Sequence, residues 1–261
     1  MSKALITESH LTDIANAIIA KGGATAPMTP AQMAAAIAVI PSGGGFSLPV
    51  PASSYYEQSM THFYDIWENG GDGIHVENPS TICDLVGQLD MTVLDCGVCT
   101  GSSICKIKNS DFAAVADDSG LDTSGDRSAE ITVFGSYNNT QYDIFVAVGK
   151  GGIIGFHGSG SQFVFNAARS FRWNCEKSIT EKKVHTLTAN FRNNLCVSAF
   201  VDGSQCEITS TSTTFSTVSG FGFLPYQSLS NCSSLRLYSG HRTLQQHNAN
   251  HELDIRRFEN E

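Results

Sequence analysis

Residues 184–203 read VHTLTANFRNNLCVSAFVDG, and this stretch indicates how the chain folds. Polar and apolar residues alternate along 186–191, which is the pattern of an antiparallel strand with one buried face. A second apolar run, 195–201, lies between an Asn-Asn pair at 193–194 and an Asp-Gly pair at 202–203. Both pairs are typical of hairpin turns, because these residues tolerate the left-handed backbone conformation. We therefore predict two neighbouring antiparallel strands.

Similar runs recur along the rest of the chain from about residue 55. They are rich in Val, Ile, Phe, Tyr and Thr, and clusters of Gly, Asn, Asp and Ser separate them. No helical pattern of any length interrupts residues 125–235. We therefore predict one mainly β domain over residues 55–261, an antiparallel β-sandwich. The runs include AEITVFG (129–135), YDIFVAV (142–148), GIIGFH (152–157), QFVFNAA (162–168) and SGFGFLP (219–225).

The first 41 residues have a different, helical pattern. Apolar residues recur at helical spacing in two short segments, and Gly22-Gly23 separates them. Two helices this short cannot bury a core by themselves, so we expect residues 1–41 to form a helical hairpin that packs on another surface. A partner outside the chain is favoured because residues 42–45 give a flexible joint, and docking on the chain's own β domain is the alternative. Residues 42–54, rich in Gly, Pro and Ser, then form a linker. The expected docking residues are Leu11, Ile14, Ile18, Met33, Ile37 and Ile40.

Composition and charge exclude several classes of partner. The formal net charge is −9, and Lys and Arg form no cluster, which argues against binding to nucleic acid. No apolar run approaches the about 20 residues that a membrane-spanning helix needs, so we expect no membrane insertion. The N-terminus, MSKALITESH, lacks the apolar stretch of a secretory signal. We therefore expect the protein to be made and folded in a cytoplasm.

The 8 cysteines are expected to be reduced in that compartment. Cys96 and Cys99, with Cys105 nearby, have the one spacing that suggests metal or redox chemistry. A zinc site needs a second pair or a histidine at matching spacing, and neither follows closely. We expect no metal and no cofactor, with calcium as an alternative through three loop carboxylates, Asp117, Asp118 and Asp122.

Three stretches of the β domain resemble the laminin-G/concanavalin-like domains of phage structural proteins. The first, 63–95, keeps the turn Asp84-Leu85-Val86-Gly87, although Ile82 stands where the family often has Trp. The second, 184–206, is similar to the family's central hairpin, and the third, 234–258, to its closing strand and short helix. The resemblance implies a jelly-roll β-sandwich in a virion protein that binds carbohydrate or protein. The closing pattern falls on Arg236, Tyr238, Leu244, Asn250, Asp254, Arg257 and Phe258.

The N-terminal segment resembles an adaptor at the start of many phage tail and baseplate proteins. The similarity lies in LTDIANAI (11–18) and MTPAQMAAAIAVIP (28–41). It implies that this segment attaches the protein to the particle.

Glycoside hydrolases share this fold, so a pair of catalytic carboxylates has to be sought. They place alternate acids on one face of a strand. Glu252 and Asp254 begin such a pattern, but Arg256 and Arg257 stand where the next acid is needed. We therefore expect no catalytic residues and no enzymatic activity, and we expect Asp254 and Arg257 to make surface or capping contacts.

A glycan site needs an aromatic face for the sugar ring and polar groups for its hydroxyls. Trp173 and Asn174 lie together in FRWNCE, while His157 and Tyr137 lie in turn-rich segments. These four are the candidate ligand-binding residues, and core or rim positions are the alternative for each.

The leading hypothesis is a virion structural protein of tail, baseplate or fibre type. Its expected partners are other virion proteins, further copies of itself in a homo-oligomer such as a trimer, and a host-surface glycan. One alternative is a capsid-decorating or head-fibre protein with a purely architectural role. Another is a glycan-degrading enzyme that has lost or moved its acid pair.

Overall fold

A computed structural model describes residues 50–258, apart from 72, 108–111, 118, 120, 122–124, 136–141, 150–151, 158–161, 168–170, 175–182, 194, 211–219 and 226–229. The chain divides into two units, residues 1–48 and 49–261, and the described residues all belong to the second. The predicted helical hairpin and its docking residues lie outside the described residues. Those docking residues are Leu11, Ile14, Ile18, Met33, Ile37 and Ile40.

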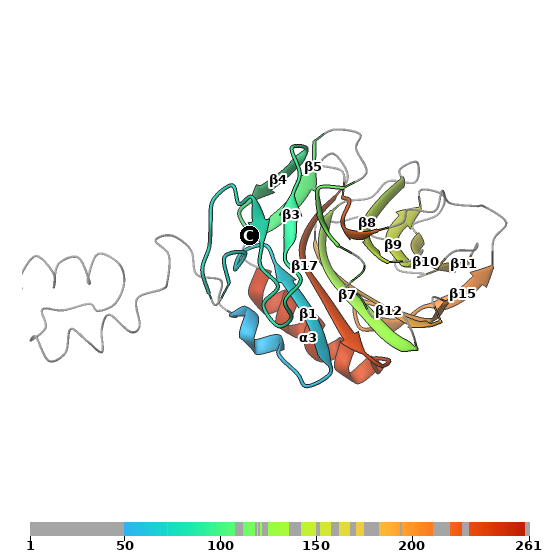
Figure 1. Cartoon of the computed structure of the whole chain (residues 1–261). Coiled ribbons are helices and arrows are strands. Elements are labelled where there is room, and N and C mark those ends of the chain that lie inside the picture. The colour runs from blue at the N-terminus through green and yellow to red at the C-terminus, as the bar shows by residue number, and fades with distance from the viewer. Residues whose placement is uncertain are drawn as a thin grey trace, which may run out of the picture. The chain divides into compact units, whose positions relative to one another are not determined.

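The second unit is mainly β and contains two large antiparallel sheets (Figure 1). The larger one is an 8-stranded sheet in the order β14-β13-β12-β7-β17-β5-β4, with β1 also paired to β17. Its long central strands are β7 (Asp126–Gly135), β12 (Lys183–Arg192) and β17 (Ser230–Ser239). The others are β1 (Met60–Asp65), β4 (Gly97–Thr100), β5 (Ser103–Lys106), β13 (Leu195–Val201) and β14 (Ser204–Gln205).

The second sheet is 7-stranded, in the order β10-β9-β8-β16-β6-β3-β2, and β11 and β15 form a separate pair. Its strands are β2 (Thr81–Ile82), β3 (Met91–Val93), β6 (Ala114–Ala116), β8 (Tyr142–Val148), β9 (Gly152–His157), β10 (Gln162–Ala167) and β16 (Phe221–Phe223). The separate pair is β11 (Phe171–Asn174) with β15 (Glu207–Ser210). A mainly β fold with antiparallel sheets is therefore confirmed.

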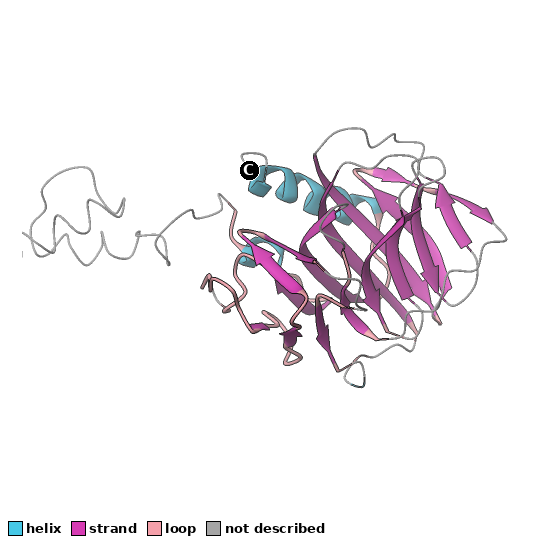
Figure 2. Ribbon diagram, turned by 90° about the horizontal axis from the view of Figure 1, so that it is seen from above, coloured by secondary structure: helices cyan, strands magenta, loops and turns pink. Residues whose placement is uncertain are grey.

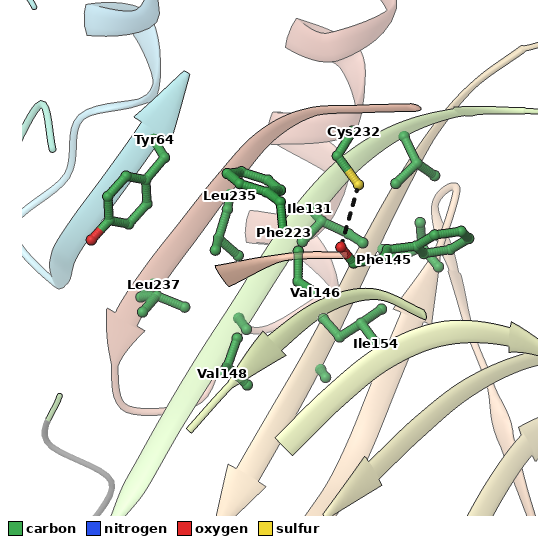
Figure 3. Close-up of a cluster of buried hydrophobic side chains, with 14 of the residues drawn as sticks. Tyr64, Ile131, Phe145, Val146, Val148, Ile154, Phe223, Cys232, Leu235 and Leu237 are labelled. Carbon is green, nitrogen blue, oxygen red and sulfur yellow. Dashed lines mark hydrogen bonds between the residues drawn. The ribbon is translucent and has the colours of Figure 1, made fainter. Parts of the chain in front are cut away.

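Alternate residues of the two sheets build one apolar core. Ile131 of β7 and Leu235 of β17 enter it from the larger sheet, and Val146 of β8 and Phe223 of β16 enter it from the other (Figure 3). All four side chains are fully buried. This packing is consistent with the predicted sandwich, in which period-2 alternation supplies one apolar face per sheet.

The hairpin turn predicted at the Asp-Gly pair is confirmed. Asp202 and Gly203 both have positive φ, 45° and 79°, and they join β13 to β14. Asn193 also has a positive φ, 48°, at the connection between β12 and β13. Residues of this kind adopt this backbone region with little strain, so they fix the turns and the register of the strands.

A single turn of 3-10 helix, η1 (Ala52–Tyr55), precedes β1, and the helix α3 (Leu244–Phe258) follows β17. Figure 2 shows α3 against one face of the sheets. Its side chains bond to residues of β12 and β7 that point away from the apolar core, such as Thr186, Thr188 and Thr132. Within the part of the chain that is described, no helix is long and apolar enough to cross a bilayer.

The interface beneath α3 is ionic, which differs from the surface contacts expected for Asp254 and Arg257. Both residues are buried, with 0% and 1% exposure. Asp254 bonds to Arg236 at 2.8 Å, and Arg257 bonds to Asp65 at 2.9 Å. The expectation was wrong because a sequence pattern shows the helix face but not that the opposing sheet face is itself polar. Buried charges of this kind require partners.

Glu130 on β7 anchors the same interface. It lies 3.3 Å from the Arg236 guanidinium, and its other oxygen accepts a hydrogen bond from Thr188 at 2.7 Å. Burial alone would raise the pKa of Glu130, but Arg236 and the nearby His247 hold it well below its usual range. The carboxylate therefore stays ionised and fixes α3 to the sheet.

Candidate functional site

The structure describes only the backbone of three of the predicted ligand residues. Trp173 and Asn174 lie on β11, opposite Ile208 and Glu207 of β15. His157 ends β9, in a different sheet, so the structure does not place it on a strand paired with β11. Tyr137 lies outside the described residues.

Of the three carboxylates in the predicted calcium loop, one belongs to the described residues. Asp117 is exposed, and a hydrogen bond from the Ser119 backbone lowers its pKa. Asp118 and Asp122 lie outside the described residues. Within the described ranges, His, Cys, Asp and Glu form no group of three that could hold a metal ion.

The Cys96–Cys99 motif lies at the start of the hairpin of β4 and β5. Cys99 lies opposite Ile104, and its neighbour Val98 lies opposite Cys105. Burial raises the pKa of the Cys99 thiol to about 12, with a smaller contribution from Cys105. A thiol that stays protonated is a poor metal ligand and a poor nucleophile.

An open polar pocket lies where three distant segments meet. It has a volume of about 540 Å³. The segments are the loop between η1 and β1, the end of β17 and the first turn of α3. We call it the Glu57 pocket, and its lining residues are Glu57, Gln58, Ser59, Ser239 and Gln246.

Backbone hydrogen bonds hold the pocket together. The Ser239 backbone N–H donates to the Ser59 carbonyl at 2.8 Å, which ties the end of β17 to the loop before β1. The Met60 N–H donates to the Glu57 carbonyl at 3.0 Å and closes a turn within that loop. The Ser239 hydroxyl also donates to the Ser59 carbonyl, at 3.2 Å. The polar side chains are therefore presented from a fixed backbone.

Glu57 is the charged residue of the pocket lining, and its carboxylate is held at one oxygen. Oε1 accepts a hydrogen bond from Arg242 Nη1 at 2.6 Å and another from the Ser59 hydroxyl. Within the described part of the chain, Oε2 accepts no hydrogen bond. The side chain is 29% exposed. One carboxylate oxygen is therefore fixed and the other is available as an acceptor.

Arg242 holds the Glu57 side chain of the pocket in place. Its side chain is 2% exposed, and the guanidinium packs 4.0 Å above the Tyr238 ring. Burial alone would lower the pKa of Arg242, but Glu130, Tyr238 and Glu57 together raise it. The guanidinium therefore stays charged, and it links the pocket to the ionic interface beneath α3.

Gln246 is fixed by the start of α3. Thr243 and Gln246 form a capping box, in which the Gln246 N–H donates to the Thr243 hydroxyl at 3.3 Å. In return, Gln246 Oε1 accepts hydrogen bonds from the Thr243 N–H at 2.9 Å and from its hydroxyl at 3.1 Å. Because Oε1 is occupied in this way, the amide nitrogen Nε2 is oriented as a donor.

Sequence reasoning missed this pocket, although part of its signal was present. The run Tyr55-Tyr56-Glu57-Gln58-Ser59 combines aromatic, acidic, amide and hydroxyl side chains. Tyr55 is buried against Phe63, whereas Tyr56 is 43% exposed. Such a mixture is what sugar binding needs, but nothing in the sequence shows that residues near 240 complete the site.

Comparison with known proteins adds a likeness in fold. No protein-family model and no curated protein matches the chain. Among solved structures, Trypanosoma rangeli sialidase is similar over 96% of this chain, with a TM-score of 0.52 and 12% identity. The same sialidase in complex with sialic acid is similar over 95%, with a TM-score of 0.51 and 11% identity. The chain spans 38% and 39% of those two sialidase chains, and the likeness shows the fold alone.

This likeness corrects the prediction that the chain is not an enzyme, because the fold is shared with sialidases. The prediction rested on the failed acid pattern at Glu252 and Asp254. In the structure both residues lie on α3, where Glu252 is exposed and Asp254 is buried. The failed pattern therefore concerns one helix, and it excludes no acid pair elsewhere in the chain.

Proposed function

We propose that the chain is a virion structural protein whose β domain binds a glycan on the host surface through the Glu57 pocket. In this proposal the domain is a jelly-roll sandwich of the laminin-G/concanavalin type. Residues 1–41 attach it to the phage particle. The protein acts in the virion after assembly in a bacterial cytoplasm, with other virion proteins and further copies of itself as partners.

The observation that carries the glycan proposal is the chemistry of the pocket. Every lining side chain can form hydrogen bonds, and two of them, Glu57 and Gln246, are held in place by bonds to other protein groups. Sugar hydroxyls both donate and accept, so a fixed acceptor and a fixed donor suit them. Tyr56, exposed next to Glu57 in the chain, supplies an aromatic surface close in sequence.

The attachment proposal is supported by the sequence resemblances. A single open pocket binds weakly, but several copies on a symmetric particle raise the avidity without any new contact. Deleting residues 1–41 is expected to abolish incorporation into particles while leaving the fluorescence and thermal unfolding of the β domain unchanged. Normal incorporation of the truncated chain would overturn this part of the proposal.

A glycan array tests the binding proposal directly. We expect the full chain to bind a subset of glycans, and the variant Ser239→Trp, which fills the pocket from an exposed position, to lose that binding. The variant Ser80→Trp is the matched control, because Ser80 is exposed and is not part of the pocket lining. Binding that survives Ser239→Trp would overturn the assignment to this pocket. Normal incorporation into particles without any glycan binding would instead favour the architectural, capsid-decorating alternative.

A second candidate function is the cleavage of a glycan, and the likeness to sialidases favours it. The test is to measure released sugar from each glycan that the array identifies, sialylated glycans included. Release by the full chain would support this candidate, and binding without release would support the first.

A further inference from the structure

We infer that the Glu57 pocket selects a neutral sugar, which it recognises through a pair of neighbouring hydroxyls. One hydroxyl donates to Glu57 Oε2, and the other accepts from Gln246 Nε2. This inference rests on the proposed glycan-binding function and goes further by naming the ligand class and the two recognising atoms.

The same guanidinium holds both recognising residues. Arg242 Nη1 donates to Glu57 Oε1 at 2.6 Å, and Arg242 Nη2 donates to the Gln246 backbone carbonyl at 3.0 Å. The two side chains therefore lie around one rigid, buried group, and their spacing changes little when a ligand binds. A preorganised pair of this kind loses little conformational entropy on binding.

The acceptor and the donor are complementary to a diol. A carboxylate oxygen that accepts no hydrogen bond from the described residues can accept one from a sugar hydroxyl, and such a bond is charge-assisted. The Gln246 amide, oriented by its bonds to Thr243, offers an N–H to the neighbouring hydroxyl oxygen. The hydroxyls of Ser59 and Ser239 already donate to Glu57 Oε1 and to the Ser59 carbonyl, so their oxygens provide further acceptors.

Charge argues against an acidic sugar. Among the described lining residues Glu57 alone is charged, and the cation bound to it, Arg242, is 2% exposed and also donates to the Gln246 carbonyl. Within the described lining, a ligand carboxylate would therefore meet a like charge and no accessible cation. The formal net charge of −9 adds to the repulsion at a distance.

The test compares a neutral galactose- or glucose-terminated glycan set with the same glycans capped by sialic acid, using the full chain. The variant Glu57→Gln keeps the size of the side chain but replaces the charged acceptor. The variant Gln246→Glu keeps the capping box but replaces the amide donor. We expect each variant to weaken neutral-glycan binding by about tenfold or more. Glu252→Gln, exposed on the same helix and absent from the pocket lining, is the matched control and should change nothing.

The outcomes separate this inference from the proposed function. Preference of the wild type for uncapped glycans, together with weaker binding of those glycans by Glu57→Gln and Gln246→Glu while thermal unfolding stays within a few degrees, supports it. Preference for the sialylated glycans, or unchanged binding in both variants, overturns the inference and leaves glycan binding standing. Absence of binding to every glycan overturns the proposed function itself, and this inference falls with it.

Discussion

Replacing Asp254 by alanine should destabilise the β domain more than any surface change. The Asp254 carboxylate accepts five hydrogen bonds: one from Tyr55, two from Arg236, and one each from Thr132 and Thr186. Their lengths lie between 2.6 and 3.1 Å. Removing it leaves the fully buried Arg236 guanidinium with Glu130 as its remaining ion-pair partner.

The size of the effect follows from the loss of one of the two carboxylates that pair with this buried guanidinium. Breaking a buried ion pair by removing one partner costs about 3–5 kcal/mol, and we expect about 4 kcal/mol here. For a domain of this size the melting temperature should fall by roughly 10 °C. Urea unfolding followed by tryptophan fluorescence measures the loss, because both tryptophans, Trp67 and Trp173, belong to the β domain.

Two further variants make this prediction falsifiable. Asp254→Asn keeps the side-chain volume and loses the charge. Its free energy of unfolding should therefore lie between those of the wild type and Asp254→Ala. Glu252→Ala, two residues away and exposed, should change stability by less than about 0.5 kcal/mol. If Asp254→Ala cost no more than Glu252→Ala, the ionic interface beneath α3 would not stabilise the fold.

Three other predictions concern separate parts of the β domain. Gly87→Ala should destabilise it by about 2 kcal/mol or more, because the new Cβ would lie 2.3 Å from Asp84 Oδ2 and 2.9 Å from the Thr61 carbonyl oxygen; a urea midpoint equal to that of the wild type would contradict this. Asp84 accepts hydrogen bonds from His62 and from backbone N–H groups, which outweigh burial and lower its pKa. Its stabilising contribution is therefore present above the unfolded value of about 3.9 and is lost as pH falls through the lower folded value. Asp84→Asn should accordingly reduce stability at pH 7 and lose that difference in strong acid, and a deficit independent of pH would exclude this cause. Cys99, with its pKa raised to about 12, should react with iodoacetamide at pH 8 far more slowly than free glutathione, as mass spectrometry of the labelled peptide can show.

Several residues that match the closing pattern of phage structural proteins stabilise the fold of the β domain. Arg236, Tyr238, Asn250, Asp254 and Arg257 all lie buried between α3 and the larger sheet. Tyr238 and Asn250 bond to each other at 3.0 Å, and Asn250 also donates to Glu130. The pattern therefore identifies the contacts that fix the closing helix, and the ligand pocket has to be sought elsewhere.

The sequence alone determined several of the strands and the Asp202-Gly203 turn. Leu187, Ala189 and Phe191 alternate with polar residues, and in the structure all three are buried. The Asp202-Gly203 turn follows equally directly, since positive φ is a local property of those residues. Both features depend on neighbours a few positions apart, which a sequence displays.

Only the tertiary structure decided that the polar face of the larger sheet is covered and where the pocket lies. Glu57 and Arg242 are 185 positions apart and bond at 2.6 Å because β1 and β17 are paired and α3 follows β17. The alternating pattern predicts that the polar face of a half-buried strand is exposed. In the structure α3 buries the polar residues Thr186, Thr188 and Glu130. Strand order and register set such contacts, and they depend on packing across the whole domain, which local periodicity does not encode.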